Sequence, residues 1–188
     1  AHDGMAAFPV EGDPTRCLIV RNHELGATSP VSAFGADLSR ASRIDRAHIY
    51  DSSPAGKPFA GGTTTALVNL KTNRVERSHL SLAGTAVNCA GGSTPWGSWL
   101  SCEETQMLPG PQASKRHGFI FEVPAAAMAP VAPVPLTAMG RFEHEAAAVD
   151  PSTGIVYLTE DTGDSLFYRF LPNSRGELAK GGRLQALA

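Results

Sequence analysis

The segment NCAGGSTPWGSWLSCEET (Asn88–Thr105) combines residue types that bind metals with residue types that shape a backbone. Cys89 as a thiolate would be a soft metal ligand, while Glu103 and Glu104 offer hard carboxylate oxygens. Its glycines let a chain approach a ligand closely, and its two tryptophans would hold such a loop still. Residue types alone therefore fit a metal-binding loop and a packing segment equally well.

The segment RNHEL offers a second set of oxygen ligands. Asn22 and Glu24 are two residues apart, which places them on one face of an extended chain with His23 on the other. An amide oxygen and a carboxylate on one face are ligands that calcium accepts. We interpret this pair as half of a calcium site.

Acidic residues gather a third time in RFEHEAAAVD and the following YLTED. Glu143 and Glu145 share one strand face and His144 takes the opposite face. Glu160 and Asp161 end the next strand-like run, so we expect them at a rim. Rim carboxylates are usually solvated, and this cluster would not predict a site by itself.

Several other kinds of site are not indicated. GGTTT (Gly61–Thr65) has no lysine after it and lacks the pattern of a phosphate-binding loop. A GxSxG elbow is absent, which disfavours an α/β-hydrolase. HEAAA has no second histidine, so it does not match the HExxH zinc motif.

Composition is that of a soluble globular protein: 188 residues, 42% hydrophobic, with a net charge of −2. Lysine and arginine are scattered, which gives no footprint for nucleic acid or an anionic membrane. No apolar run approaches the roughly 20 residues of a membrane-spanning helix. Three cysteines are too few for a disulfide scaffold. We expect Cys17, within CLIV, to be a buried small hydrophobe, and a Cys89–Cys102 disulfide stays open as an alternative.

Short β-type runs separated by turn residues recur along the whole chain. Helical signals are confined to Gly35–Ile44 and to one turn at Pro124–Ala129. The predicted strands lie in RCLIVRN, TTALVNL, RVERSHLSL, GSWLSC, HGFIFEV, EAAAVD, IVYLTED and SLFYRFLP. We therefore predict an all-β fold forming one domain over residues 1–188.

Regular short strands fit a sandwich, a barrel or a propeller, and their spacing does not choose among these. A four-stranded propeller blade takes roughly 40–45 residues. The length would then supply about four blades.

Taken in order, these segments resemble the PhoX family of alkaline phosphatases. The resemblance covers most of Val20–Pro172 and is carried by VRNHEL, GGTTT, NCAGGSTPWGSWLSCEET, HGFIFEV, GRFEHEAAAVDPSTGIVYLTED and YRFLP. It implies a β-propeller, six-bladed in the family, and a phosphomonoesterase that uses ferric iron and calcium. It also implies export to the periplasm or beyond and a small phosphate monoester as substrate. We expect the protein to be a monomer.

By position, the resemblance implies an iron-binding thiolate and several carboxylate ligands. Glu103 and His144 are expected in supporting or packing roles, and Asp164 is an alternative to the last two ligands. The implied metal ligands are Cys89, Asn22, Glu24, Glu104, Glu145, Glu160 and Asp161. The two metals would neutralise a phosphate dianion, which explains how the reaction proceeds without a Ser-His-Asp triad.

The family also has a later Arg-Pro-Glu motif, which these residues lack. The chain is thus expected to be incomplete at its C-terminus, and its directly catalytic groups stay unassigned. Two other functions stay open. One is a propeller that binds metal or a ligand without catalysis, because a shared fold does not guarantee shared chemistry. The other is a calcium-dependent lactonase or diesterase.

Overall fold

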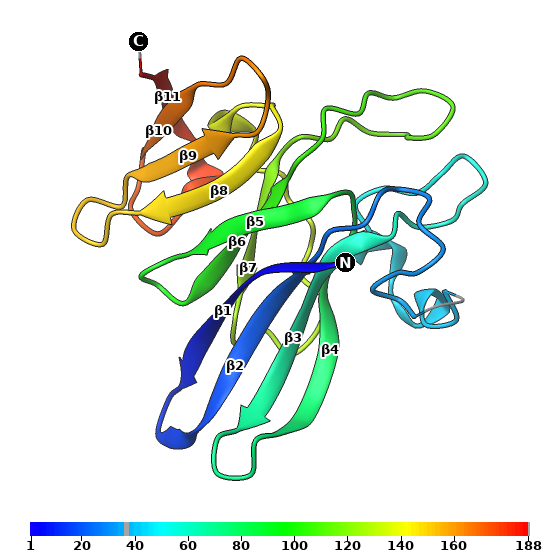
Figure 1. Cartoon of the computed structure of the whole chain (residues 1–188), viewed down its shortest axis with the longest axis vertical. Helices are drawn as coiled ribbons and strands as arrows, with labels where there is room; N and C mark the ends of the chain where they lie inside the picture. The colour runs from blue at the N-terminus through cyan, green and yellow to red at the C-terminus, as the bar shows by residue number, and fades with distance from the viewer. Residues whose placement is uncertain (36–37, 188) are drawn as a thin grey trace.

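The computed structural model describes residues 1–35 and 38–187, which form three antiparallel sheets (Figure 1). In each sheet the spatial order of the strands follows the order of the chain. The first sheet holds β1 (His2–Val10), β2 (Asp13–His23), β3 (Gly61–Asn69) and β4 (Arg74–Thr85). The second holds β5 (Asn88–Ser93), β6 (Ser98–Glu103) and β7 (Ile120–Pro124). The third holds β8 (His144–Val149), β9 (Val156–Glu160), β10 (Phe167–Pro172) and β11 (Gly182–Ala186).

The predicted all-β class is confirmed, and the sheets have the form of propeller blades. The hairpin predicted at residues 71–73 joins β3 to β4, and Asn73 takes a positive φ of 55° in its turn. Chain length predicted about four blades, whereas the described residues form three sheets. The difference lies in long connections at residues 24–60, 104–119 and 125–143, which use chain without adding strands.

The second sheet is the middle layer, because both of its faces are buried. Trp99 and Phe121 pack toward the first sheet, against residues such as Val20. Their neighbours Leu100 and Ile120 pack toward the third sheet in a separate core. Alternating side chains of β6 and β7 thus fill two cores, which is why every residue of β6 is buried.

The two outer sheets each have one face in a core and one face that carries exposed hydrophobic side chains. On the first sheet Met5 is 53% exposed and Val75 is 60% exposed. On the third sheet Phe167 is 45% exposed beside Tyr157, with which it stacks. The three blades therefore form an arc in which the middle blade alone has both faces covered.

The first strands of the three sheets lie at the inner edge of the arc, where β5 packs against β1 and against β8 (Figure 1). Glycine permits this close approach. A β-carbon at Gly4 would lie 2.8 Å from the Cα atom of Ala90, and one at Gly92 would lie 1.9 Å from the carbonyl oxygen of Ala147. The segment at Cys89 that the sequence suggested as a loop is therefore a strand, and its glycines fit it between two neighbouring sheets.

Helical structure is limited to four short 3₁₀ turns among the described residues: η1 (Ala41–Arg43), η2 (Arg46–His48), η3 (Thr137–Met139) and η4 (Leu178–Lys180). The helix predicted over Gly35–Ile44 includes residues 36 and 37, which lie outside the described residues, and its described part contains only η1. The turn predicted at Pro124–Ala129 is a non-helical turn after β7. None of the described helices has the length and apolar character needed to cross a membrane.

Candidate metal centre

Each of the three inner strands contributes a ligand-type side chain from its second residue. These residues are Asp3 on β1, Cys89 on β5 and Glu145 on β8. The sulfur of Cys89 lies 3.4 Å from both carboxylate oxygens of Glu145 and 3.9 Å from Oδ1 of Asp3. Equivalent positions on three packed strands thus bring a thiol and two carboxylates to one point.

Glu104 completes this cluster from the segment that follows β6. Cys89, Glu104 and Glu145 each offer one ligand atom, and these three atoms lie within 4.8 Å of one another, which is close enough to share one ion. The Glu104 backbone N–H donates to the carbonyl oxygen of Val87, 2.9 Å away, which ties this residue to the chain just before β5. Three of the predicted ligands are therefore brought together.

The charges around the cluster are negative and partly buried. Burial raises the pKa of Glu104, and the charges of Glu145, Asp161 and Glu24 raise it further. Burial also raises the pKa of the Cys89 thiol, as do its hydrogen bond to Glu145 and the charge on that carboxylate. A bound cation would reverse both effects, since it would stabilise the thiolate and the carboxylates together.

The other predicted ligands lie at different distances from this cluster. Glu24 and Asp161 are near enough to act electrostatically on Glu104. Glu160 instead accepts hydrogen bonds from the Tyr168 hydroxyl at 3.0 Å and from the backbone N–H of Leu166 at 3.2 Å. Asp164 is exposed. Glu24 and Asp161 are therefore candidate additional ligands near the cluster, while Glu160 is hydrogen-bonded to Leu166 and Tyr168.

Asn22, a predicted calcium ligand, is completely buried and fully hydrogen-bonded within the protein. Its Nδ2 donates to the carbonyl oxygens of Cys89 and Ala90, both at 2.7 Å. Its Oδ1 accepts from Trp99 Nε1 at 2.9 Å and from Ser101 Oγ at 2.8 Å. Both lone pairs of the amide oxygen are thus occupied. In this structure Asn22 holds the backbone of Cys89 in place and presents no free oxygen.

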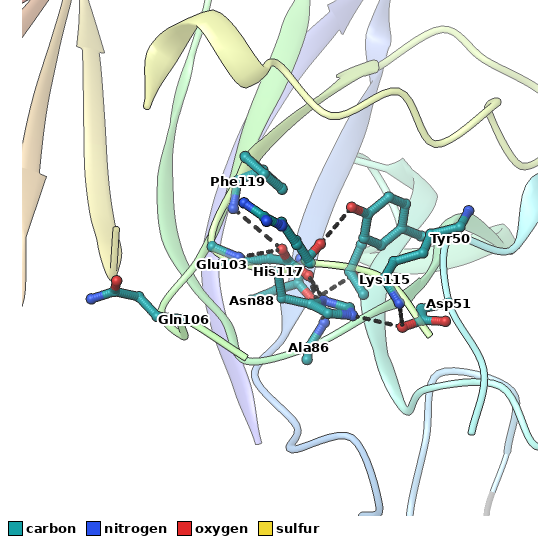
Figure 2. Close-up of polar contacts among 12 residues, drawn as sticks. Tyr50, Asp51, Ala86, Asn88, Glu103, Gln106, Lys115, His117 and Phe119 are labelled. Carbon is teal, nitrogen blue, oxygen red and sulfur yellow. Dashed lines mark hydrogen bonds and ion pairs between the residues drawn. The ribbon is translucent and has the colours of Figure 1, made fainter. Parts of the chain in front are cut away.

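Glu103 and His144 point away from the cluster, as their strand positions predicted, and both are completely buried. Glu103 forms a buried chain with His117 and Asp51 (Figure 2). His117 Nδ1 lies 2.7 Å from Glu103, and its Nε2 lies 3.1 Å from Asp51. Burial lowers the pKa of His117, but the hydrogen bonds and charges of the two carboxylates together hold it above its ordinary value.

The three cysteines are free, so the alternative of a Cys89–Cys102 disulfide is wrong. Cys102 is completely buried in the core between the second and third sheets. Cys17 is only half-buried, contrary to prediction, because it alternates with the core residues Leu18 and Val20 and so lies on the other face of β2. Cys89 is thus the one cysteine of the chain that contacts carboxylates of the cluster.

Asp3 is the cluster residue that sequence reasoning missed. Its segment AHDGMAAFPV alternates toward Phe8 in the manner of a strand, but nothing in it resembles a metal motif. A usable signal was the glycine that follows it, since Gly4 marks the close approach of β1 to β5.

The sheet arrangement and the cluster together define a β-propeller-type protein with a candidate metal centre at its inner strands. The sequence matches the family described as "Alkaline phosphatase PhoX" over residues 1–188. The chain therefore belongs to the PhoX alkaline phosphatase family. No curated protein sequence matches it at a significant level.

A solved structure of Pseudomonas fluorescens PhoX, in complex with vanadate, a transition state analogue, has a similar fold. The TM-score is 0.63 at 20% sequence identity, and the similarity covers 98% of this chain. It covers 45% of the Pseudomonas chain, so this chain spans less than half the length of that relative. This likeness supports the assignment of the three sheets as part of a propeller.

Proposed function

We propose that this chain carries part of the active centre of a metal-dependent phosphomonoesterase that uses ferric iron and calcium. The observation that supports this most directly is the convergence of Cys89, Glu104 and Glu145, whose ligand atoms lie within 4.8 Å of one another. Family membership supplies the reaction class, which is the hydrolysis of phosphate esters.

The residues present suit the two kinds of metal. The Cys89 thiolate is a ligand for a transition metal such as iron, with carboxylate oxygens from Glu145 and Glu104 beside it. Glu24 and Asp161 extend the acidic rim and provide the hard oxygens that calcium prefers. When bound, the metals supply the positive charge that a phosphate dianion needs.

The protein's own contribution is to hold these ligands in place. The inner strands fix the positions of Cys89 and Glu145, and Asn22 fixes the Cys89 backbone through two carbonyl contacts. Phosphoryl transfer depends mainly on such positioning and on electrostatic stabilisation. Vanadate bound to the Pseudomonas relative supports a small phosphate monoester as the substrate. We further propose a periplasmic or secreted location.

The direct test is hydrolysis of p-nitrophenyl phosphate by the purified chain, with and without a chelator, followed by re-addition of iron and calcium separately and together. We expect activity that the chelator abolishes and that returns only when both metals are supplied. Activity that survives complete metal removal would contradict the proposal. Metal binding without any hydrolysis would instead favour the non-catalytic propeller as the function of these 188 residues.

A further inference from the structure

Val87 has an unusual backbone conformation immediately before the strand that carries Cys89. Its φ angle is +48°, in the left-handed region that β-branched residues rarely adopt. Such conformations persist only where surrounding interactions enforce them, and they concentrate at functional sites. Val87 lies between the end of β4 and the start of β5, so its conformation sets the direction in which β5 begins.

Backbone hydrogen bonds hold Val87 between two other segments of the centre. Its N–H donates to the carbonyl oxygen of Leu25 at 2.9 Å, and its carbonyl oxygen accepts from the N–H of Glu104 at 2.9 Å. Leu25 directly follows Glu24, and Val87 is two residues from Cys89. One strained residue therefore connects the three segments that carry Glu24, Cys89 and Glu104.

The Glu103 carboxylate holds the adjoining backbone from the opposite side. Its Oε1 accepts from the N–H of Ala86 at 3.0 Å and from His117 at 2.7 Å. Its Oε2 accepts from the N–H groups of Gly118 at 3.0 Å and Phe119 at 3.3 Å. Four donors thus meet one buried carboxylate, and Figure 2 shows Ala86, His117 and Phe119 arranged around it. An amide in place of this carboxylate would direct its NH₂ group at two of those donors.

Asp51 fixes the far end of this buried chain. Its carboxylate accepts from His117 Nε2 at 3.1 Å and from the N–H groups of Ser114 at 3.0 Å and Lys115 at 2.9 Å. The His117 ring also stacks on Phe59, with ring centroids 5.0 Å apart. Because both nitrogens of His117 face carboxylates, the ring orientation is fixed from two sides.

We propose that Glu103, held by His117 and Asp51, is a positioning residue that keeps Val87 in its left-handed conformation and thereby aligns Cys89 with Glu104 for metal binding. This inference rests on the proposed function, since it takes the cluster to be a metal site. Without the hydrogen bonds that Glu103 accepts, Val87 would relax to a negative φ, and the start of β5 would turn the thiol away from the carboxylates. Glycine at position 87 could take the positive φ at little steric cost, with or without these hydrogen bonds.

The test is a titration of the metal-free chain with Co²⁺, followed by the thiolate-to-cobalt charge-transfer absorption. We expect Glu103→Gln to weaken Co²⁺ binding by about 10- to 100-fold, the usual effect of losing a residue that orients a ligand. Val87→Gly alone is titrated as the reference for the double variant. The double variant Glu103→Gln/Val87→Gly should recover most of the lost affinity, because glycine takes a positive φ without the steric cost that valine has.

Asn73→Gly is the matched control, since Asn73 also has a positive φ, of 55°, but lies in the β3–β4 hairpin. Recovery by Val87→Gly but not by Asn73→Gly would establish the positioning role. Equal recovery by both, or Co²⁺ binding unchanged in Glu103→Gln, would overturn it. Absence of Co²⁺ binding to the wild type would overturn the metal-site proposal itself. Should Glu103→Gln fail to fold, Asp51→Asn applies the same test, because Asp51 holds the His117 ring that bonds Glu103.

Discussion

The Cys89 sulfur lies 3.4 Å from both carboxylate oxygens of Glu145, although the two residues belong to the inner strands of different sheets. A thiol in this position donates a hydrogen bond to the carboxylate and keeps its proton, because burial and negative charge both oppose the thiolate. A metal ion would replace that proton, so metal binding should release protons and should strengthen as pH rises.

Glu145→Gln should make the Cys89 thiol easier to ionise in the metal-free chain. The substitution removes a negative charge that raises the pKa of Cys89 and replaces a charged hydrogen-bond acceptor with a weaker neutral one, whereas burial, the largest cause, stays. Since only the thiolate reacts, the curve of iodoacetamide labelling rate against pH should move by about one unit to lower pH. The experiment uses a Cys17→Ser background so that Cys17 is not labelled, and Cys102 is completely buried. The labelling rate then reports on Cys89. An unmoved curve would argue against the Cys89–Glu145 contact.

Asp3→Asn should weaken metal binding by about tenfold with little effect on folding, because Asp3 lies beside the Cys89 sulfur on the inner strand β1. The control is Asp13→Asn, which alters a carboxylate of the same sheet that bonds Thr15 and Arg16. Calorimetric titration of both variants with metal provides the comparison. Equal affinities would remove Asp3 from the centre.

Asn22→Ala should destabilise the metal-free chain by about 2–4 kcal/mol, because it leaves two buried carbonyl groups and two buried donors without a partner. Asn69→Ala removes an amide with exposed hydrogen bonds and should cost less than about 1 kcal/mol. Urea unfolding in the presence of a chelator measures both. If Asn22 acts as a metal ligand only, its variant will match the wild type under these conditions.

Gly92→Ala should be among the most damaging alanine substitutions in the second sheet. The new β-carbon would lie 1.9 Å from the Ala147 carbonyl oxygen, so β5 and β8 must separate. We expect a loss of about 2 kcal/mol or more in the free energy of unfolding, together with weaker metal binding. Gly26→Ala is the matched control, since nothing lies within 4 Å of its added β-carbon. Similar stability of the two variants would contradict the packing of the inner strands.

The sequence predicted the hairpins and most strands because those signals are local. The turn at residues 71–73 and the alternation in β9 and β10 can be recognised within a few neighbouring residues. The packing of β1, β5 and β8 at one inner edge is not a local property. It depends on glycines such as Gly92, whose role is defined by an atom of another sheet.

The candidate site was also predicted only in part, because contacts between sheets cannot be recognised from neighbouring residues in the sequence. Cys89, Glu104 and Glu145 were found through motif resemblance, and the structure brings them together. Asn22 was assigned from strand alternation, which gives the face of a side chain but not its partners. Those partners are backbone atoms of Cys89 and Ala90 on another sheet. Asp3 was missed because its segment resembles any short strand.

Elemental mass spectrometry of the purified chain and of its Cys89→Ser and Cys102→Ser variants shows whether Cys89 binds iron. We expect iron and calcium in the wild type and loss of iron in Cys89→Ser. Cys102→Ser should keep close to the wild-type iron content, because its thiol lies in the core between two sheets. Iron retained in full by Cys89→Ser, or absent from the wild type, would contradict the assignment of an iron centre to this cluster.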